Sequence, residues 1–265
     1  MHCEPLQHTP APPQTVGIDR ALAFVKLARL MAALVRAGWI LSMRFPRMGR
    51  DDRLAQRQRW AQSVLAILDV DVRCTGSTTA PSAALVVANH LSWLDILVIQ
   101  SVTPGVFVAK AEVRRWPLIG AVAQACATIF VQRSSTRSAR AMVQRCVATF
   151  AQGYSVVGFP EGTSTNGSHV GPFHSNLFEA AVQAGVQVQP LTLRYLDAQT
   201  RLPSDAPVFI GDTTLVRSLR KVLAAPSISA HVHVGTIIPT LGHTRRSLAA
   251  LAHQSVRESL RHMAA

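Results

Sequence analysis

The feature that most constrains the fold is a regular alternation of short apolar runs and longer amphipathic segments after Trp60. Short runs rich in Val, Ile and Leu predict buried strands, and apolar residues three or four positions apart predict helices. We expect strands at 85–88, 106–109, 128–132, 154–159, 188–195, 208–210 and 228–234, and helices at 94–102, 121–127, 138–152, 176–184, 214–224 and 244–263. This alternation predicts an α/β fold with a mixed, mostly parallel sheet covered by helices.

The segment that precedes the alternation is both apolar and basic. Charged residues interrupt residues 18–43, so a conventional membrane-spanning helix is not expected there. On a helical wheel, Lys26, Arg29 and Arg36 share one side. The opposite side is apolar and carries Phe24, Leu27, Met31, Val35 and Trp39. We therefore expect amphipathic helices at 17–60 that lie in a lipid interface; the alternative is a helical hairpin packed on the main domain with a solvated basic side.

Charge and composition narrow the cellular setting. The 265 residues include 27 Lys and Arg against 14 Asp and Glu, and 48% are hydrophobic. A chain that is basic and apolar together favours an anionic membrane surface as partner over nucleic acid. Residues 1–16 lack the basic start and apolar core of a secretory signal and are predicted to be a flexible tail. Four scattered cysteines indicate reduced thiols, which favours the cytoplasmic face of the cell membrane.

Acidic residues are scarce in the middle of the chain, so the few that occur there call for an explanation. Asp95 follows His90 by five positions, just after a predicted strand. Ser92-x-x-Asp95 has the spacing of a capping box, which puts Asp95 in the first turn of a helix and leaves His90 free to fold back onto it. A carboxylate that holds one imidazole nitrogen leaves the other as a general base. The alternative is that Asp95 only caps the helix and His90 only ends the strand.

A second acidic position also follows a predicted strand. Glu161 stands in the segment Phe159-Pro160-Glu161-Gly162-Thr163 and is followed by Ser164. A charge, a glycine and hydroxyls after a strand are typical of a ligand-binding loop at the carboxyl edge of an open α/β sheet. Backbone N–H groups near Gly162 are candidates to face an oxyanion or a polar head group. The alternative is an ordinary exit from a strand into a turn.

Several segments share an order and spacing that point to one family. They are Asn89-His90 with Asp95, Lys110-Ala111-Glu112, Trp116-Pro117-Leu118-Ile119-Gly120, Ile129-Phe130-Val131-Gln132-Arg133, Phe159-Pro160-Glu161-Gly162-Thr163, and Pro190. Together they resemble the sequence blocks of the PlsC-type acyltransferase superfamily, the 1-acylglycerol-3-phosphate acyltransferases. The resemblance is close over about residues 85–195. It implies a glycerolipid acyltransferase-like domain at 61–265.

The resemblance implies acyl transfer from a thioester donor, acyl-ACP or acyl-CoA, to the free hydroxyl of a lyso-lipid. His90 would take the proton of the acceptor hydroxyl as its oxygen attacks the thioester carbonyl. Asp95 would fix the tautomer of His90 and stabilise the imidazolium that forms. The leading acceptor is 1-acyl-sn-glycerol-3-phosphate, which would give phosphatidic acid.

The same resemblance implies the residues that bind substrate. Arg133 and Lys110 are candidates for the head group of the acceptor, and Gly162 and Thr163 belong to the loop that meets it. Glu161 either contacts polar groups of the acceptor or orders the loop. No cofactor and no metal are expected, since the acyl thioester is a co-substrate and no enzyme nucleophile is required.

The chain departs from the family pattern at positions where phosphate would bind. Ser164 replaces an arginine of the family, and Pro172-Phe173-His174-Ser175 lacks the basic residue that often follows the Phe. Loss of such cations weakens the case for a phosphate-bearing acceptor. A subgroup that acylates lyso-ornithine lipid is similar here, and residues 209–215 also resemble it. O-acylation of lyso-ornithine lipid is therefore the alternative function.

One further interpretation comes from a different class of protein, and one weaker feature concerns metal binding. A basic, non-enzymatic protein that binds nucleic acid or anionic lipid would use the arginines Arg44, Arg47, Arg50, Arg53, Arg57 and Arg59. That cluster has one interleaved aromatic residue and no recognisable nucleic-acid module. His231 and His233 lie on one side of a predicted strand but lack an evident third metal ligand.

Overall fold

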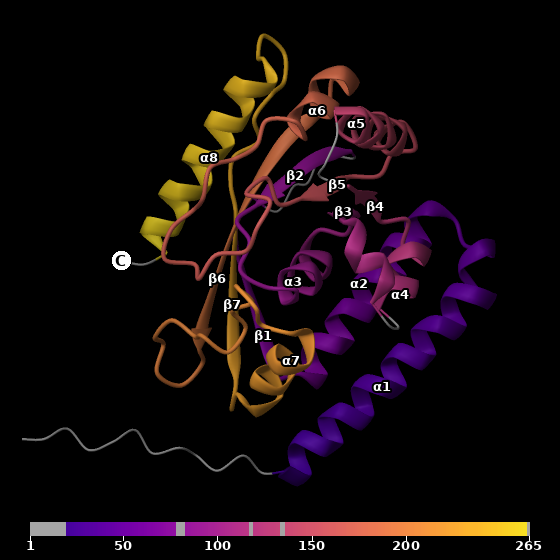
Figure 1. The fold of residues 1–265 in the computed structure, drawn as a ribbon, viewed down its shortest axis with the longest axis vertical. Helices are drawn as coiled ribbons and strands as arrows, with labels where there is room; N and C mark the ends of the chain where they lie inside the picture. The colour runs from indigo at the N-terminus through magenta and orange to yellow at the C-terminus, as the bar shows by residue number, and fades with distance from the viewer. Residues whose placement is uncertain (1–19, 78–82, 117–118, 133–135, 264–265) are drawn as a thin grey trace, which may run out of the picture.

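The computed structural model describes residues 20–77, 83–116, 119–132 and 136–263, and these form one sheet with helices on both faces (Figure 1). The strands are β1 (Val70–Gly76), β2 (Ala84–Ala88), β3 (Val106–Lys110), β4 (Ile129–Val131), β5 (Val156–Gly158), β6 (Gln187–Asp197) and β7 (Ile228–Val234). They are arranged in the order β1-β7-β6-β2-β5-β3-β4. Among these strands the β6–β7 pair is antiparallel and the other pairs are parallel. The sheet is therefore mixed and mostly parallel, as the sequence predicts.

Among the described elements, two α-helices precede the first strand, one follows the last strand, and the others lie in connections between strands. They are α1 (Arg20–Met43), α2 (Arg50–Ile67), α3 (Leu94–Val102), α4 (Ile119–Ala125), α5 (Thr136–Ala151), α6 (Phe178–Ala184), α7 (Leu215–Ala224) and α8 (Arg245–His262). Two 3₁₀ turns, η1 (Phe45–Arg47) and η2 (Ala111–Arg115), complete the described elements. The helix predicted at 94–102 has the same bounds as α3, because an apolar, glycine-free segment follows a well-defined loop.

Each face of the sheet has its own core. Figure 1 shows α5, α6 and α8 on one side of the sheet and α1, α2, α3 and α7 on the other. Successive residues of β2 point to opposite faces: Leu85 and Val87 join the first core, while Val86 and Ala88 join the second. A strand buried on both faces reads as a continuous apolar run, which explains why β2 is visible in the sequence.

The structure differs from the predicted strands in two places. Residues 208–210 form no strand, because Phe209 instead crosses the loop after β2 and donates its N–H to the Leu91 carbonyl at 2.9 Å. Strand β1 was not predicted. It lies at the edge of the sheet and only Val70 is buried, so it lacks the apolar run that marks a central strand.

The N-terminal helix does not divide into the cationic and apolar faces that the helical wheel predicts. Lys26 is 5% exposed and its Nζ lies 2.6 Å from Asp69 Oδ2, in the turn after α2. The buried side of α1 includes Lys26, Leu30, Ala37 and Ile40, and this side faces the rest of the protein. The exposed surface of α1 is largely apolar, with Leu22, Phe24, Val25, Leu27, Met31, Val35, Trp39 and Met43 on it. The wheel places Lys26 on the wrong surface, because it takes no account of the carboxylate supplied by Asp69.

The expected boundary between N-terminal helices and catalytic domain, at residue 60, falls inside α2. Ala61, Val64 and Leu65 of α2 are buried in the same core as Leu30 of α1. The N-terminal helices are thus continuous in packing with the α3 side of the sheet. The predicted tail at 1–16 lies outside the described residues.

Within the described ranges, no helix combines the length and hydropathy that crossing a bilayer requires.

Candidate active site

His90, Glu161 and Lys110, which the sequence singles out, lie at the carboxyl edge of the sheet. Strand β2 ends at Ala88 and leads into His90, and β5 ends at Gly158 and leads into Glu161. These two strands are parallel neighbours, so their carboxyl ends lie side by side. Lys110 is the last residue of β3, the next strand along, and is exposed at the same edge.

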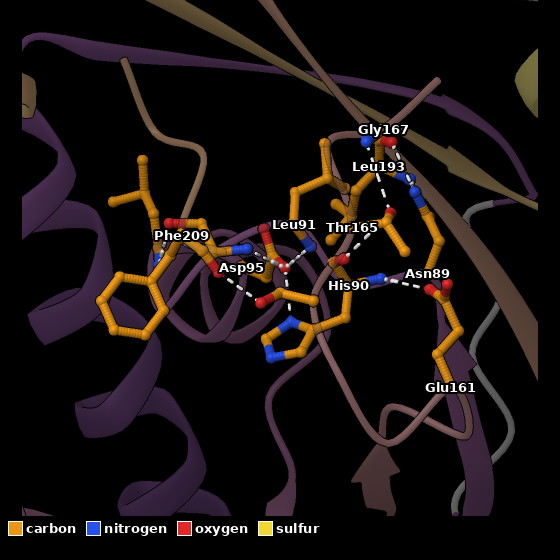
Figure 2. A network of polar contacts seen from close by, with 12 residues as sticks. Asn89, His90, Leu91, Asp95, Glu161, Thr165, Gly167, Leu193 and Phe209 are labelled. Atoms are coloured by element: carbon orange, nitrogen blue, oxygen red, sulfur yellow. Dashed lines mark hydrogen bonds and ion pairs between the residues drawn. The ribbon is translucent and has the colours of Figure 1, made fainter. Parts of the chain in front are cut away.

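His90 contacts Asp95 through its Nδ1. The distance from Nδ1 to Asp95 Oδ2 is 2.7 Å, and Figure 2 shows the ring turned toward the carboxylate. Asp95 lies in the first turn of α3 and is fully buried, whereas 23% of the His90 side chain is exposed. Because Asp95 holds Nδ1, Nε2 is the nitrogen left to meet a substrate.

The same carboxylate oxygen organises the loop between β2 and α3. Asp95 Oδ2 also accepts the backbone N–H groups of Leu91 at 2.7 Å and Ser92 at 2.9 Å. The Ser92 hydroxyl accepts the Leu94 N–H at 3.2 Å. These bonds form the carboxylate half of the predicted capping box, while the serine half reaches Leu94 instead of Asp95. The loop therefore holds His90 against Asp95 through the backbone as well as through the side chains.

Tyr195 supplies the second contact to Asp95, which the sequence did not predict. Its hydroxyl donates to Asp95 Oδ1 at 2.7 Å from strand β6, which pairs with β2. Burial, followed by the charge of Asp95 and the hydrogen bond to it, raises the pKa of Tyr195 well above its ordinary value. The raised pKa keeps the phenol protonated at neutral pH, so the hydroxyl donates to Asp95. The one available signal was a tyrosine in an apolar strand, since a buried hydroxyl requires a partner.

Phe159 positions the imidazole ring from the other side. The ring centroids of His90 and Phe159 lie 4.0 Å apart with an interplanar angle of 17°, which is a stacked arrangement. Phe159 comes from the end of β5, and its ring also lies near Phe107 of β3. A stacked ring and a buried carboxylate together fix both the plane and the tautomer of His90. The sequence marks Phe159 as part of a motif but not as a support for the imidazole.

Glu161 connects the two loops of the site. Its carboxylate accepts the His90 N–H and the Gly171 N–H, each at 2.7 Å, and the side chain is 5% exposed. Burial raises the pKa of Glu161, although these two hydrogen bonds and the neighbouring His90 oppose the rise. Of the two roles that the sequence leaves open for Glu161, these contacts support the ordering of the loop.

A family model described as Acyltransferase matches residues 71–194. The chain is 36% identical over 250 residues to the lyso-ornithine lipid O-acyltransferase of Pseudomonas aeruginosa, an alignment that covers 91% of this chain and 94% of the relative. The chain belongs to the acyltransferase family. It is also 36% identical over 151 residues to the 1-acyl-sn-glycerol-3-phosphate acyltransferase of Neisseria meningitidis, which covers 56% of this chain and 59% of the relative.

A solved structure of this family confirms the fold. The crystal structure of the 1-acyl-sn-glycerophosphate acyltransferase PlsC from Thermotoga maritima matches with a TM-score of 0.70 and 21% sequence identity. The match covers 93% of this chain and 96% of that chain. The acyltransferase fold therefore includes the N-terminal helices as well as the sheet.

The remaining family-motif residues are placed as follows. Gly162 adopts a positive φ of 70°, which favours glycine, and its N–H donates to the Phe159 carbonyl at 3.0 Å. That N–H is therefore engaged inside the turn and does not face a reacting carbonyl. Thr163 is exposed beside it. Arg133, the candidate for the acceptor head group, lies outside the described residues.

Ser164, at the position where the family resemblance leads us to expect an arginine, contributes to loop packing. The hydroxyl of Ser164 donates to the backbone carbonyl of Phe209. Thr165 donates its N–H to the His90 carbonyl at 2.8 Å, and Asn89 exchanges two hydrogen bonds with the backbone of Leu193. The segment after β5 and the segment around Phe209 thus both pack against the β2–α3 loop (Figure 2).

No group of three or more His, Cys, Asp or Glu side chains among the described residues could hold a metal ion. His231 contacts the Ser229 hydroxyl at 3.1 Å, and His233 contacts the Thr75 hydroxyl at 3.2 Å. Both imidazoles of β7 therefore have partners within the sheet.

Proposed function

We propose that this acyltransferase transfers a fatty acyl group from a thioester to the hydroxyl of a lyso-lipid, with His90 as the general base. The observation that carries the proposal is the contact between His90 Nδ1 and the fully buried Asp95, which leaves Nε2 free in a side chain that is 23% exposed. Nε2 takes the hydroxyl proton as the acceptor oxygen attacks the thioester carbonyl. The C–S bond then breaks, and the imidazolium returns the proton to the departing thiolate.

Asp95 and Phe159 hold the base in place for this step. The carboxylate stabilises the positive charge that develops on the imidazolium, and the stacked ring keeps the imidazole in one plane. General-base catalysis of this kind contributes about 10² to 10⁴ in rate, or about 3 to 5 kcal/mol. The donor in this proposal is acyl-ACP or acyl-CoA, and no cofactor is needed because the thioester is already activated.

Lyso-ornithine lipid is the acceptor that we propose first. The full-length relative from Pseudomonas aeruginosa carries that acceptor in its name, and so does the relative from Rhizobium meliloti, which is 33% identical over 215 residues. Ser164 supports the same choice, since it packs against Phe209 where a phosphate-binding arginine would stand. The second candidate is 1-acyl-sn-glycerol-3-phosphate, the acceptor favoured by the sequence motifs alone. It is supported by the relative from Neisseria meningitidis.

We also propose that the enzyme lies at the cytoplasmic face of the cell membrane, with α1 against the lipid. Phe24, Val35 and Trp39 on the outer surface of α1 are 71%, 70% and 57% exposed. Arg29 and Arg36 are exposed on the same helix. An apolar surface with flanking arginines fits a bilayer that contains anionic lipids.

A panel of acceptors tests the chemistry. Purified enzyme is given one labelled acyl donor with lyso-ornithine lipid, with 1-acyl-sn-glycerol-3-phosphate, or with no acceptor. We expect release of free thiol only when an acceptor is present, with the higher kcat/KM for lyso-ornithine lipid. Preference for the phosphate-bearing acceptor would reverse our assignment. Thiol release that does not depend on an acceptor would show a hydrolase instead.

His90→Ala tests the base directly. We expect kcat to fall by about 10² to 10⁴ with the fold intact. His262→Ala is the matched control, because His262 is exposed in the last turn of α8. Near-normal turnover by His90→Ala, with unchanged circular dichroism, would refute the assignment of the base.

Vesicle flotation tests the orientation of α1. We expect Val35→Ser with Trp39→Ser to weaken binding to vesicles that contain phosphatidylglycerol. Leu241→Ser is the control, since Leu241 is 92% exposed in the loop before α8. Equal binding by the α1 variant and the control would contradict this orientation.

A further inference from the structure

A cavity of about 340 Å³ lies away from His90, at the opposite edge of the sheet. Val106 is the first residue of β3 and Tyr154 precedes β5, so the cavity opens near the amino ends of these strands. Its walls come from the end of α1, η1, α2, the region after α4, and α5. The volume is at the lower end of the range typical of small-molecule sites.

Arg57 is the buried charge of this cavity. It lies on α2 and is 7% exposed, yet its Nε and Nη1 have no hydrogen-bond partner in the part of the chain that the structure describes. A buried guanidinium without partners is unfavourable, because each N–H loses its hydrogen bonds to water. The described protein groups therefore do not meet the hydrogen-bonding capacity of Arg57 Nε and Nη1.

Aromatic rings define the direction from which an acceptor can approach Arg57. The carbon at the centre of its guanidinium lies 5.3 Å from the ring centroid of Phe45 and 5.9 Å from that of Tyr154. Cation–π contacts of this kind stabilise the charge but do not provide acceptors for the N–H groups at its edge. The unsatisfied hydrogen-bonding capacity therefore lies at the edge of the guanidinium.

Arg53 adds a second positive charge to the same cavity. Its guanidinium carbon lies 5.4 Å from the Phe45 ring centroid, and its Nε donates to the Phe45 carbonyl at 3.1 Å. The ion pairs found among the described residues include neither Arg53 nor Arg57. Two like charges beside one ring, with no carboxylate between them, favour the binding of an anion.

We propose that this cavity is an anion site, separate from the His90 centre, that binds a phosphate group at the edge of the Arg57 guanidinium. Guanidinium groups bind phosphate oxygens in bidentate fashion, and two of them balance the double negative charge of a phosphate monoester. Thr149 and Gln152 of the α5 end add polar walls, while Leu41 and Val106 add apolar ones. The phosphate comes either from a soluble compound or from the head group of a lipid.

Isothermal titration calorimetry tests the site without any acyl donor, so its result is independent of the proposed function. The probes are inorganic phosphate, glycerol 3-phosphate and dihexanoyl phosphatidic acid, each at constant ionic strength in chloride. We expect saturable binding by the wild type. Equal affinity for all three probes indicates a soluble phosphate, whereas preference for dihexanoyl phosphatidic acid indicates a lipid head group.

Substitutions of the cavity arginines test whether the phosphate probes bind in this cavity. Arg57→Met is expected to weaken binding at least tenfold, and Arg53→Gln by a smaller factor. Arg59→Met is the matched control, because it removes the same charge from an exposed position on α2. His90→Ala is expected to keep the wild-type affinity, which separates this cavity from the catalytic centre.

Three results would overturn the proposal. They are wild-type affinity in both the Arg57 and Arg53 variants, equal weakening by Arg59→Met, and absence of binding by any of the three probes at millimolar concentration. Circular dichroism confirms the fold of each variant. If Arg57→Met does not fold, the comparison of Arg53→Gln with Arg59→Met decides between a located site and general charge attraction.

Discussion

Tyr195→Phe isolates the support that strand β6 gives to the catalytic pair. The substitution removes one hydroxyl and keeps the ring, so the packing of a residue that is 2% exposed is preserved. It deletes the 2.7 Å hydrogen bond to Asp95 Oδ1, whereas Asp95 Oδ2 keeps its bonds to His90, Leu91 and Ser92. The variant therefore leaves the carboxylate in place but removes the contact that orients its second oxygen.

The structure sets the size of the expected changes in thermal stability and in turnover. A hydrogen bond to a charged group contributes about 1.5 to 3 kcal/mol, and Asp95 is fully buried, so water cannot replace the lost donor. For a chain of this length we expect Tm to fall by about 3 to 12 °C. Because Oδ2 remains fixed by three donors, kcat should fall only about tenfold, or about 1.4 kcal/mol, and KM should not change.

Thermal unfolding and steady-state kinetics measure these effects together. Thr192→Val on the same strand is the matched control: it removes a buried hydroxyl that makes a longer hydrogen bond, 3.4 Å to the Val256 carbonyl, and it should leave kcat unchanged. The pH profile of kcat should shift in Tyr195→Phe and not in the control. If Tyr195→Phe lowers Tm but changes neither kcat nor its pH profile, the hydroxyl is structural only and our reasoning is wrong.

Two further predictions concern buried charges. Glu161→Gln leaves one backbone N–H facing an amide N–H₂ and should lower the free energy of unfolding by about 1 to 3 kcal/mol at neutral pH. Because folding raises the pKa of Glu161, the contribution of this carboxyl group to stability declines as the pH rises above 4.5. Denaturant titrations at several pH values should show this decline in the wild type and not in Glu161→Gln. Asp69→Asn should destabilise the protein more than Lys26→Met, because it leaves the buried charge of Lys26 without its partner, whereas the Asp69 side chain is 49% exposed to water. Equal losses of unfolding free energy in urea melts would contradict this asymmetry.

Local sequence patterns predicted much of the fold. Strand β2 and helix α3 appear in the sequence because a continuous apolar run, a polar loop and a helix start follow one another within twenty residues. The contact of His90 with Asp95 is also local, because the capping geometry of a single turn brings the two side chains together. The sequence does not predict edge strand β1, because only one of its residues is buried and the strand therefore lacks an apolar run.

Contacts between distant segments required the tertiary structure. Tyr195 reaches Asp95 from a hundred positions away because β6 pairs with β2, and the sequence contains no signal for that pairing. The inward position of Lys26 depends likewise on Asp69, which belongs to a different element. The burial of Arg57 depends on Phe45 and Tyr154, which reach it from η1 and from the segment before β5.

The sequence by itself therefore determined the alternation of strands and helices and the family motifs, and it predicted the pairing of His90 with Asp95 as one of two alternatives. Each of these follows from the periodicity of a segment or from the geometry of one turn, which depend on neighbouring residues. The tertiary structure decided which buried polar groups have partners. That outcome depends on strand order and helix packing, because a desolvated charge is stabilised only by whatever another segment places beside it.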